Sequence, residues 1–152
     1  MKPLFTIFLI AICALATGAR GQNDLKKPPT ASCPDAREIN PLHVYGLWHA
    51  EFEGLSQGAT LLFEKHPELA DSFSGAINRD GVKALLAGDV DQGELTLEES
   101  LDGQHISATW LGTVVENSCG KEIKGLWNNT SPKAPDGAAS HPFVLRKLPG
   151  WQ

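Results

Sequence analysis

The chain has 152 residues, 41% of them hydrophobic and 20% charged, and its 18 acidic side chains exceed its 13 basic ones, giving a formal net charge of −5. This length suits one domain with a substantial core. The acidic balance and the lack of basic runs argue against binding to nucleic acid or to an anionic membrane surface, because both depend on cationic side chains.

The first nineteen residues predict a secretory signal peptide. Lys2 is followed by an uncharged apolar run over residues 4–16, which is shorter than the roughly 20 residues of a membrane span. Small residues at 17–19 suit a signal peptidase, so we expect cleavage after Ala19 or shortly beyond it, and export to a periplasm or to the exterior. Loss of Lys2 would leave 12 basic against 18 acidic side chains, a net charge of −6. Residues 20–32 are polar and contain proline, which predicts a linker before a single domain over 33–152.

Two of the three cysteines remain after that cleavage. Cys13 lies in the predicted signal, and an even pair in an oxidising compartment predicts a disulfide between Cys33 and Cys119. Chain-entropy models assign roughly 4–5 kcal/mol to closing a loop of this length. The alternative is a metal or redox site, but the sequence contains no C-x-x-C and zinc prefers four closely spaced ligands. We therefore predict no metal site and no cofactor.

From Leu47 onwards, short runs of alternating apolar and polar residues are separated by glycine, asparagine and aspartate. This spacing is typical of an all-β protein. A short helical turn is expected between Cys33 and Pro41, and residues 78–81, which include Arg79, are expected to form a turn. Residues 128–141 are expected to form a polar loop. The predicted strands cover residues 48–53, 59–64, 73–77, 82–90, 94–98, 106–114, 122–127 and 142–147.

Glycine also recurs within the predicted strands, at Gly75, Gly88, Gly112 and Gly125. A glycine inside a strand marks a bend, a bulge or a barrel corner. We therefore predict an antiparallel up-and-down meander barrel of about eight strands. The alternative is an open sandwich in which these glycines form bulges at the edges. An eight-stranded barrel has an interior that is either filled by side chains or just wide enough for one small ligand.

Two short motifs at the ends of the domain suggest a family. Gly46-Leu47-Trp48 opens the first strand and Phe143-Val144-Leu145-Arg146-Lys147 forms the last. This pairing resembles the calycin superfamily of lipocalins, fatty-acid-binding proteins and avidins, where a G-x-W opens the first strand and a final-strand cation packs over that tryptophan. The resemblance implies barrel closure by Trp48 under Arg146, or under Lys147, a contact worth ~0.5–2 kcal/mol. The T-D-Y-type motif of lipocalins and the biotin-holding residues of avidins are not evident. The chain also looks like a small exported protein of bacterial type.

Five aromatic residues occupy apolar strand positions: Trp48, Phe52, Phe63, Trp110 and Trp127. They could line a cavity for a small apolar ligand, because such sites are usually aromatic concavities. The simpler alternative, which the sequence favours, is that they fill a solid core, because tryptophan and phenylalanine also fill small barrels well.

Three groups of polar residues could be taken for metal-binding or partner-binding sites, but each also has a simpler structural explanation. His49, Glu51 and Glu53 span ~13 Å along one strand, too far for a shared metal ion, and are expected to form its wet face. Residues 89–94 fit a hairpin turn better than a calcium loop. Glu98, Glu99 and Asp102 are expected to form a solvated acidic patch that helps solubility or meets a basic partner.

The sequence favours a binding module that holds a small apolar molecule in its barrel or meets one through an open end. The alternative is an envelope or secreted protein that binds another protein, such as an enzyme it inhibits, through loops that include residues 128–141. No nucleophile, metal or phosphate-binding motif is present, and no spacing singles out a Ser-His-Asp set, so an enzyme is disfavoured.

Overall fold

The structure, a computed structural model, describes residues 33–130 and 139–150. The predicted signal peptide (1–19) and linker (20–32) lie outside the described residues, as does most of the predicted loop over 128–141.

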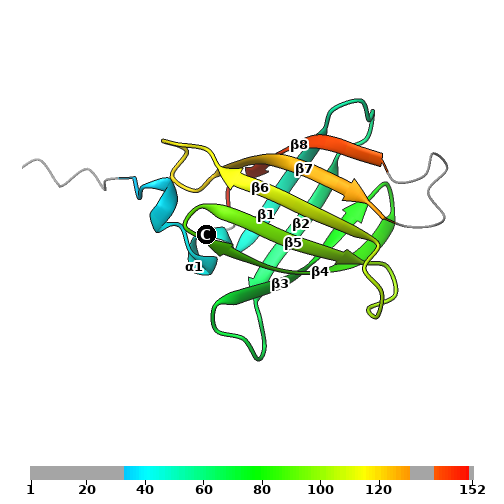
Figure 1. The fold of residues 1–152 in the computed structure, drawn as a ribbon, viewed down its shortest axis with the longest axis horizontal. Coiled ribbons are helices and arrows are strands. Elements are labelled where there is room, and N and C mark those ends of the chain that lie inside the picture. Colours follow the sequence, from blue (N-terminus) through cyan, green and yellow to red (C-terminus); the bar gives the residue numbers. More distant parts are fainter. Residues whose placement is uncertain (1–32, 131–138, 151–152) are drawn as a thin grey trace, which may run out of the picture. The chain divides into compact units, whose positions relative to one another are not determined.

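Antiparallel strands form a closed barrel in which each strand pairs with the next and the last pairs with the first (Figure 1). This confirms the predicted eight-stranded meander barrel. Two short helices, η1 (Ala36–Glu38) and α1 (Pro41–Val44), precede the barrel, and η1 coincides with the expected helical turn. The strands are β1 (Gly46–Phe52), β2 (Ala59–Lys65), β3 (Ser72–Arg79), β4 (Val82–Asp91), β5 (Glu94–Ser100), β6 (Ala108–Val114), β7 (Glu122–Asn129) and β8 (Ala139–Lys147).

Strand alternation places one face of every strand in the core. Successive side chains of a strand point to opposite faces, and residues directly opposite on neighbouring strands share a face. Ala50 lies opposite Leu145 and Phe52 lies opposite Phe143, and all four side chains are buried at the β1–β8 seam that closes the barrel. The core is therefore the barrel interior.

The four glycines within strands all lie on inward-facing positions, opposite Phe63, Phe73, Leu95 and Phe143. A Cβ at Gly125 would overlap the carbonyl oxygen of Leu111 on β6, and one at Gly112 would lie 2.9 Å from Cζ of Phe143. Only glycine allows the neighbouring strand to approach this closely, which is how these residues bend the sheet into a barrel.

Most strands extend beyond their predicted bounds, and β3, β7 and β8 do so into segments predicted to be a turn or a loop. The β3–β4 turn has two residues, Asp80 and Gly81, both with positive φ (49° and 85°), so Arg79 remains in β3, paired with Val82. Two-residue hairpins of this kind match the twist of the strands they join. The expected loop over 128–141 is corrected as well, because β7 continues to Asn129, which pairs with Ala139 at the start of β8.

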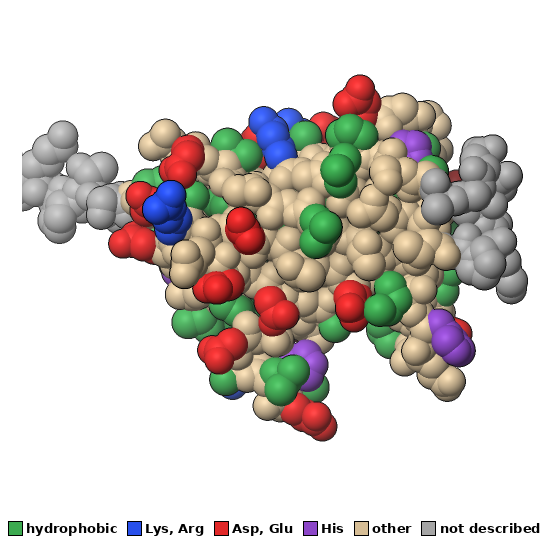
Figure 2. Space-filling view, in the orientation of Figure 1, with side chains coloured by type: hydrophobic (Ala, Val, Ile, Leu, Met, Phe, Trp, Pro, Cys, Tyr) green, Lys and Arg blue, Asp and Glu red, His purple; other side chains and the backbone are tan. Residues whose placement is uncertain are grey.

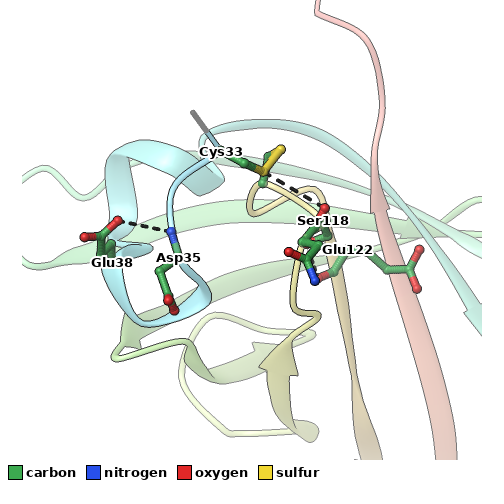
Figure 3. The surroundings of a disulfide bond; sticks show 7 residues. Cys33, Asp35, Glu38, Ser118 and Glu122 are labelled. Carbon is green, nitrogen blue, oxygen red and sulfur yellow. Dashed lines mark hydrogen bonds between the residues drawn. A yellow bond between two sulfur atoms is a disulfide. The ribbon is translucent and has the colours of Figure 1, made fainter. Parts of the chain in front are cut away.

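The predicted disulfide between Cys33 and Cys119 is confirmed, with Cα atoms 4.9 Å apart. It joins the segment before η1 to the loop between β6 and β7 (Figure 3). Next to it, the backbone N–H of Asp35 donates to the Glu38 carboxylate at 3.1 Å, while the Asp35 side chain accepts from Arg37 and caps η1.

Candidate functional site

The barrel has two unlike ends. The lid end, where β1 begins and β8 finishes, is covered by η1 and α1 (Figure 1). Ile39 and Val44 of this covering segment are 2% and 0% exposed, and Ile39 packs on the backbone of Gly120 in the β6–β7 loop. The Trp48 indole N–H donates to the Val44 carbonyl at 2.7 Å. The other end, here called the distal end, is formed by the β1–β2 loop (53–58), the β3–β4 turn (80–81) and the β5–β6 loop (101–107).

The cation that covers Trp48 at the lid end is Lys147, the second of the two expected residues, and not Arg146. Lys147 Nζ lies 5.9 Å from the Trp48 ring centroid and donates to the His43 carbonyl at 2.6 Å. Burial, with Lys121 nearby, lowers the pKa of Lys147. Arg146 is the preceding residue and therefore faces outwards, where it pairs with Glu51 at 2.7 Å. That hydrogen bond raises the pKa of Arg146.

The outer face of β1 behaves as a solvated strand face. Glu51 is exposed and bound to Arg146, while Glu53, also exposed, follows the end of the strand. Within residues 33–130 and 139–150, no group of three histidine, cysteine or acidic side chains lies close enough to hold a metal ion.

The five predicted aromatic residues are all buried, and they separate into two groups. Trp48 and Phe63 lie near the lid end with ring centroids 5.9 Å apart, and Phe73 extends that group, 4.7 Å from Phe63. Phe52, Trp110 and Trp127 form the second group towards the distal end, with centroid distances of 5.2–6.3 Å. The first group is core that supports the lid, whereas the second surrounds a charged pair.

That charged pair contains Glu99, which is 3% exposed. Its carboxylate accepts hydrogen bonds from the indole N–H groups of Trp110 and Trp127, both at 3.3 Å, and from two nitrogens of Arg79 at 3.2 and 3.1 Å. The expectation that Glu99 is solvated is wrong. Glu98 points outwards on β5, so Glu99 points inwards with Leu95 and Leu97. The sequence contains this signal, because Glu99 lies four and two positions after the two leucines.

Arg79 is the other half of the pair, and it is absent from the predicted site residues because the sequence predicts a turn over residues 78–81. The guanidinium carbon lies 4.6 Å from the Trp127 ring centroid and 5.3 Å from that of Phe52. The side chain keeps 22% of its surface exposed. Its Nε is buried and has no hydrogen-bond partner among the described residues.

Phe52, Arg79, Glu99, Trp110 and Trp127 together form what we call the distal cluster. His141 lies beside it, with its ring 5.8 Å from Trp127 and its Nδ1 3.0 Å from the Glu53 carbonyl. The arrangement combines flat apolar surfaces with a fixed guanidinium whose Nε–H has no acceptor among the described residues. Such a set can hold a small molecule that offers an apolar face and a hydrogen-bond acceptor.

Ser100, Asp102 and His105 lie together at the β5–β6 loop without forming a catalytic set. The Ser100 hydroxyl donates to the His105 carbonyl at 2.7 Å and lies 3.3 Å from the Asp102 carboxylate. A nucleophilic serine instead has its hydroxyl hydrogen-bonded to the imidazole ring. This network therefore orders the loop.

Three cavities lined by described residues lie on the barrel's outer surface or at its rim. Two neighbouring hollows of 400 and 200 Å³ lie on the outside of β3–β5, and a third of 270 Å³ lies against residues 51–53 and 142–144. The interior near the lid end is occupied by Trp48, Leu61, Phe63 and Phe73, each at most 1% exposed. A ligand of the barrel would therefore bind near the distal end.

No protein-family model and no curated protein matches the chain. A solved structure described as "Structure of EF1p2_mFAP2b bound to DFHBI" is similar in fold, with 12% sequence identity and a TM-score of 0.44; the match covers 74% of this chain and 98% of that one.

Proposed function

We propose that this chain is a non-enzymatic binding module that holds a small, largely apolar molecule at the distal end of its barrel. The observation that carries the proposal is Arg79: its side chain is partly exposed, its guanidinium is held by Glu99 and two aromatic rings, and its buried Nε–H has no acceptor among the described residues. Buried polar groups normally have partners, so an orphaned donor beside a partly exposed surface suggests a place for a ligand acceptor.

The same contacts suggest the ligand's chemistry. Phe52 and Trp127 offer ring faces to an apolar body, and Arg79 offers one hydrogen bond. Because Glu99 already neutralises the guanidinium, the ligand need not be strongly anionic; a carbonyl or a single carboxylate would suffice. The G-x-W motif and the lysine that covers Trp48 support a barrel of calycin type, in which a ligand enters through one end.

Export is part of the proposal. Its support is the basic start, the apolar run over residues 4–16 and the small residues at 17–19, together with the disulfide, which needs an oxidising compartment. The protein recovered from its host should have an intact mass that lacks residues 1–19. A recovered mass that still includes them would contradict export by cleavage.

The binding proposal is tested with anilinonaphthalene sulfonate, a fluorescent probe with flat rings and one anionic acceptor. We expect saturable 1:1 binding that quenches tryptophan fluorescence. Binding should weaken about tenfold or more in Arg79→Met/Glu99→Gln, which removes the guanidinium without stranding a buried carboxylate.

The matched control is Lys147→Met, which removes a cation near a tryptophan at the lid end. It should leave the probe affinity within about twofold. Equal affinity in all three proteins would place the probe elsewhere. Absence of saturable binding, together with native mass spectra that show no co-purified small molecule, would overturn the function itself.

A further inference from the structure

A groove runs across the outside of β3, β4 and β5, on the opposite side of the sheet from the core. The β2–β3 loop (66–71) and the β5–β6 loop (101–107) project on either side of it (Figure 1), and the surface between them is hollowed (Figure 2). Its two parts, of 400 and 200 Å³, share His66, Ala87 and Glu98. These volumes far exceed the ~30 Å³ of one water molecule, so the groove can receive side chains.

Both walls of the groove are ordered by their own hydrogen bonds. In the β2–β3 loop, His66 Nδ1 accepts from the backbone N–H groups of Glu68 and Leu69 at 3.2 and 3.0 Å. In the β5–β6 loop, the Asp102 carboxylate accepts from the His105 ring and from the N–H groups of His105 and Gln104. The hydrogen bond from the His105 ring, followed by those from the backbone, holds the pKa of Asp102 well below its usual range. A wall that is already ordered loses little conformational entropy when a partner binds.

The groove combines apolar and acidic side chains. Leu85 on the floor is 58% exposed, and Leu69 and Ile106 on the two walls are 56% and 50% exposed. Glu98 is exposed between them and forms no side-chain hydrogen bond or ion pair with another described residue. Exposed apolar patches of this kind mark surfaces that bind other molecules. The carboxylate beside the patch favours a partner that brings a positive charge.

The surrounding strands have the same sign of charge. The outward faces of β4 and β5 carry four carboxylates and one cation, and acidic side chains are visible across this side in Figure 2. The carboxylates are those of Asp89, Asp91, Glu94 and Glu98, and the cation is that of Lys83. Because the whole chain is also acidic, with a net charge of −5, a second copy of it is a poor electrostatic match for this groove.

We propose that the groove binds an extended segment of a partner protein in which a lysine or arginine stands beside apolar side chains. The cation would pair with Glu98, and the apolar side chains would cover Leu85 and Ile106. The groove lies outside the barrel, so this interaction is independent of a ligand in the distal cluster. Charge complementarity would set both the partner's orientation and its rate of association.

The probe for this proposal is a six-residue peptide of alternating leucine and lysine, titrated into the full ¹⁵N-labelled protein as recovered from its host. We expect saturable changes in amide chemical shift at Ala87, Glu98 and Ile106. A peptide of alternating leucine and glutamate should give none. Changes confined to other surfaces, or equal responses to the two peptides, would overturn the proposal.

Two matched pairs of variants separate specific binding from general charge and apolar effects. Glu98→Lys should weaken binding about tenfold or more, whereas Glu116→Lys, the same charge reversal at an exposed position of the β6–β7 loop, should change it less than about threefold. Leu85→Ser should weaken binding, and Leu111→Ser should not, although the two leucines are 58% and 54% exposed. Equal effects within either pair would contradict the groove as the binding site. Shifts at the groove that grow with protein concentration in the absence of peptide would identify a second copy as the occupant and overturn the proposal.

Discussion

The positions of Glu99 and Arg79 on their strands place two charged side chains inside the barrel. A carboxylate moved into a barrel interior loses its hydration, and this cost is offset only when its oxygens are fully hydrogen-bonded and its charge is paired. Glu99 meets both conditions through Arg79 and the two indole N–H groups. The pair adds little net stability compared with apolar residues, but removing one member leaves the other without compensation.

Removing only the cation should therefore be costly. We expect Arg79→Met to lower the free energy of unfolding by about 3–5 kcal/mol, because the buried Glu99 carboxylate would lose its paired cation and two of its hydrogen bonds. Arg79→Met/Glu99→Gln should lose less, because the neutral amide oxygen can still accept from the indoles. Urea unfolding of the two single variants and the double variant gives the coupling energy, expected to be about 1–3 kcal/mol. Strictly additive losses would show that the two side chains do not depend on each other.

At the scale of elements, alternation of apolar and polar residues locates the strands but not always their ends. All eight predicted strands are present, whereas the polar residues around Arg79 predict a turn and those around Asn129 predict a loop, and the structure extends strands through both. Near the distal end, polar side chains continue the pairing ladder: Asn128 lies opposite Ser140 and Asn129 opposite Ala139. Backbone hydrogen bonding extends a strand past its apolar pattern when the neighbouring strand is already in register.

The strands approach so closely at the inward-facing glycines that a larger residue there should strain the barrel. Gly125→Ala would place a methyl group against the Leu111 carbonyl on β6, so the β6–β7 pairing must shift. We expect a loss of about 1–3 kcal/mol of unfolding free energy, as for an overpacked core. Gly150→Ala is the control, because a Cβ there meets no atom within 4 Å, and it should stay within about 0.5 kcal/mol of the parent. Similar urea midpoints for the two variants would contradict the role of Gly125 in barrel closure.

At the scale of the whole molecule, the sequence predicts the closed meander and the Cys33–Cys119 disulfide but neither the distal cluster nor the outer groove. Turn residues and inward glycines are local signals, and they suffice for a meander whose neighbours in sequence are neighbours in space. The groove instead depends on two loops, residues 66–71 and 101–107, that are far apart in the sequence and flank the same three strands. The distal cluster forms because the side chains of Arg79 and Glu99 both point into the barrel. The sequence does not predict it, because a turn is expected at Arg79.

Apart from the backbone that continues into β1, the disulfide is the only covalent link between the lid segment (residues 33–45) and the rest of the described residues. It closes a loop with a sequence separation of 86 residues and holds the start of η1 beside the β6–β7 loop (Figure 3). We expect Cys33→Ser/Cys119→Ser to lower the free energy of unfolding by about 2–5 kcal/mol, because the unlinked unfolded chain gains conformational entropy. Dithiothreitol should lower the urea midpoint of the parent protein towards that of the variant and leave the variant unchanged.

The disulfide should also stabilise the lid locally. In the variant, amide hydrogen exchange should rise first at Ile39 and Val44, because their burial depends on the position of the lid, and last in the paired strands. Unchanged midpoints and unchanged exchange at these residues would show that packing of the lid alone is sufficient.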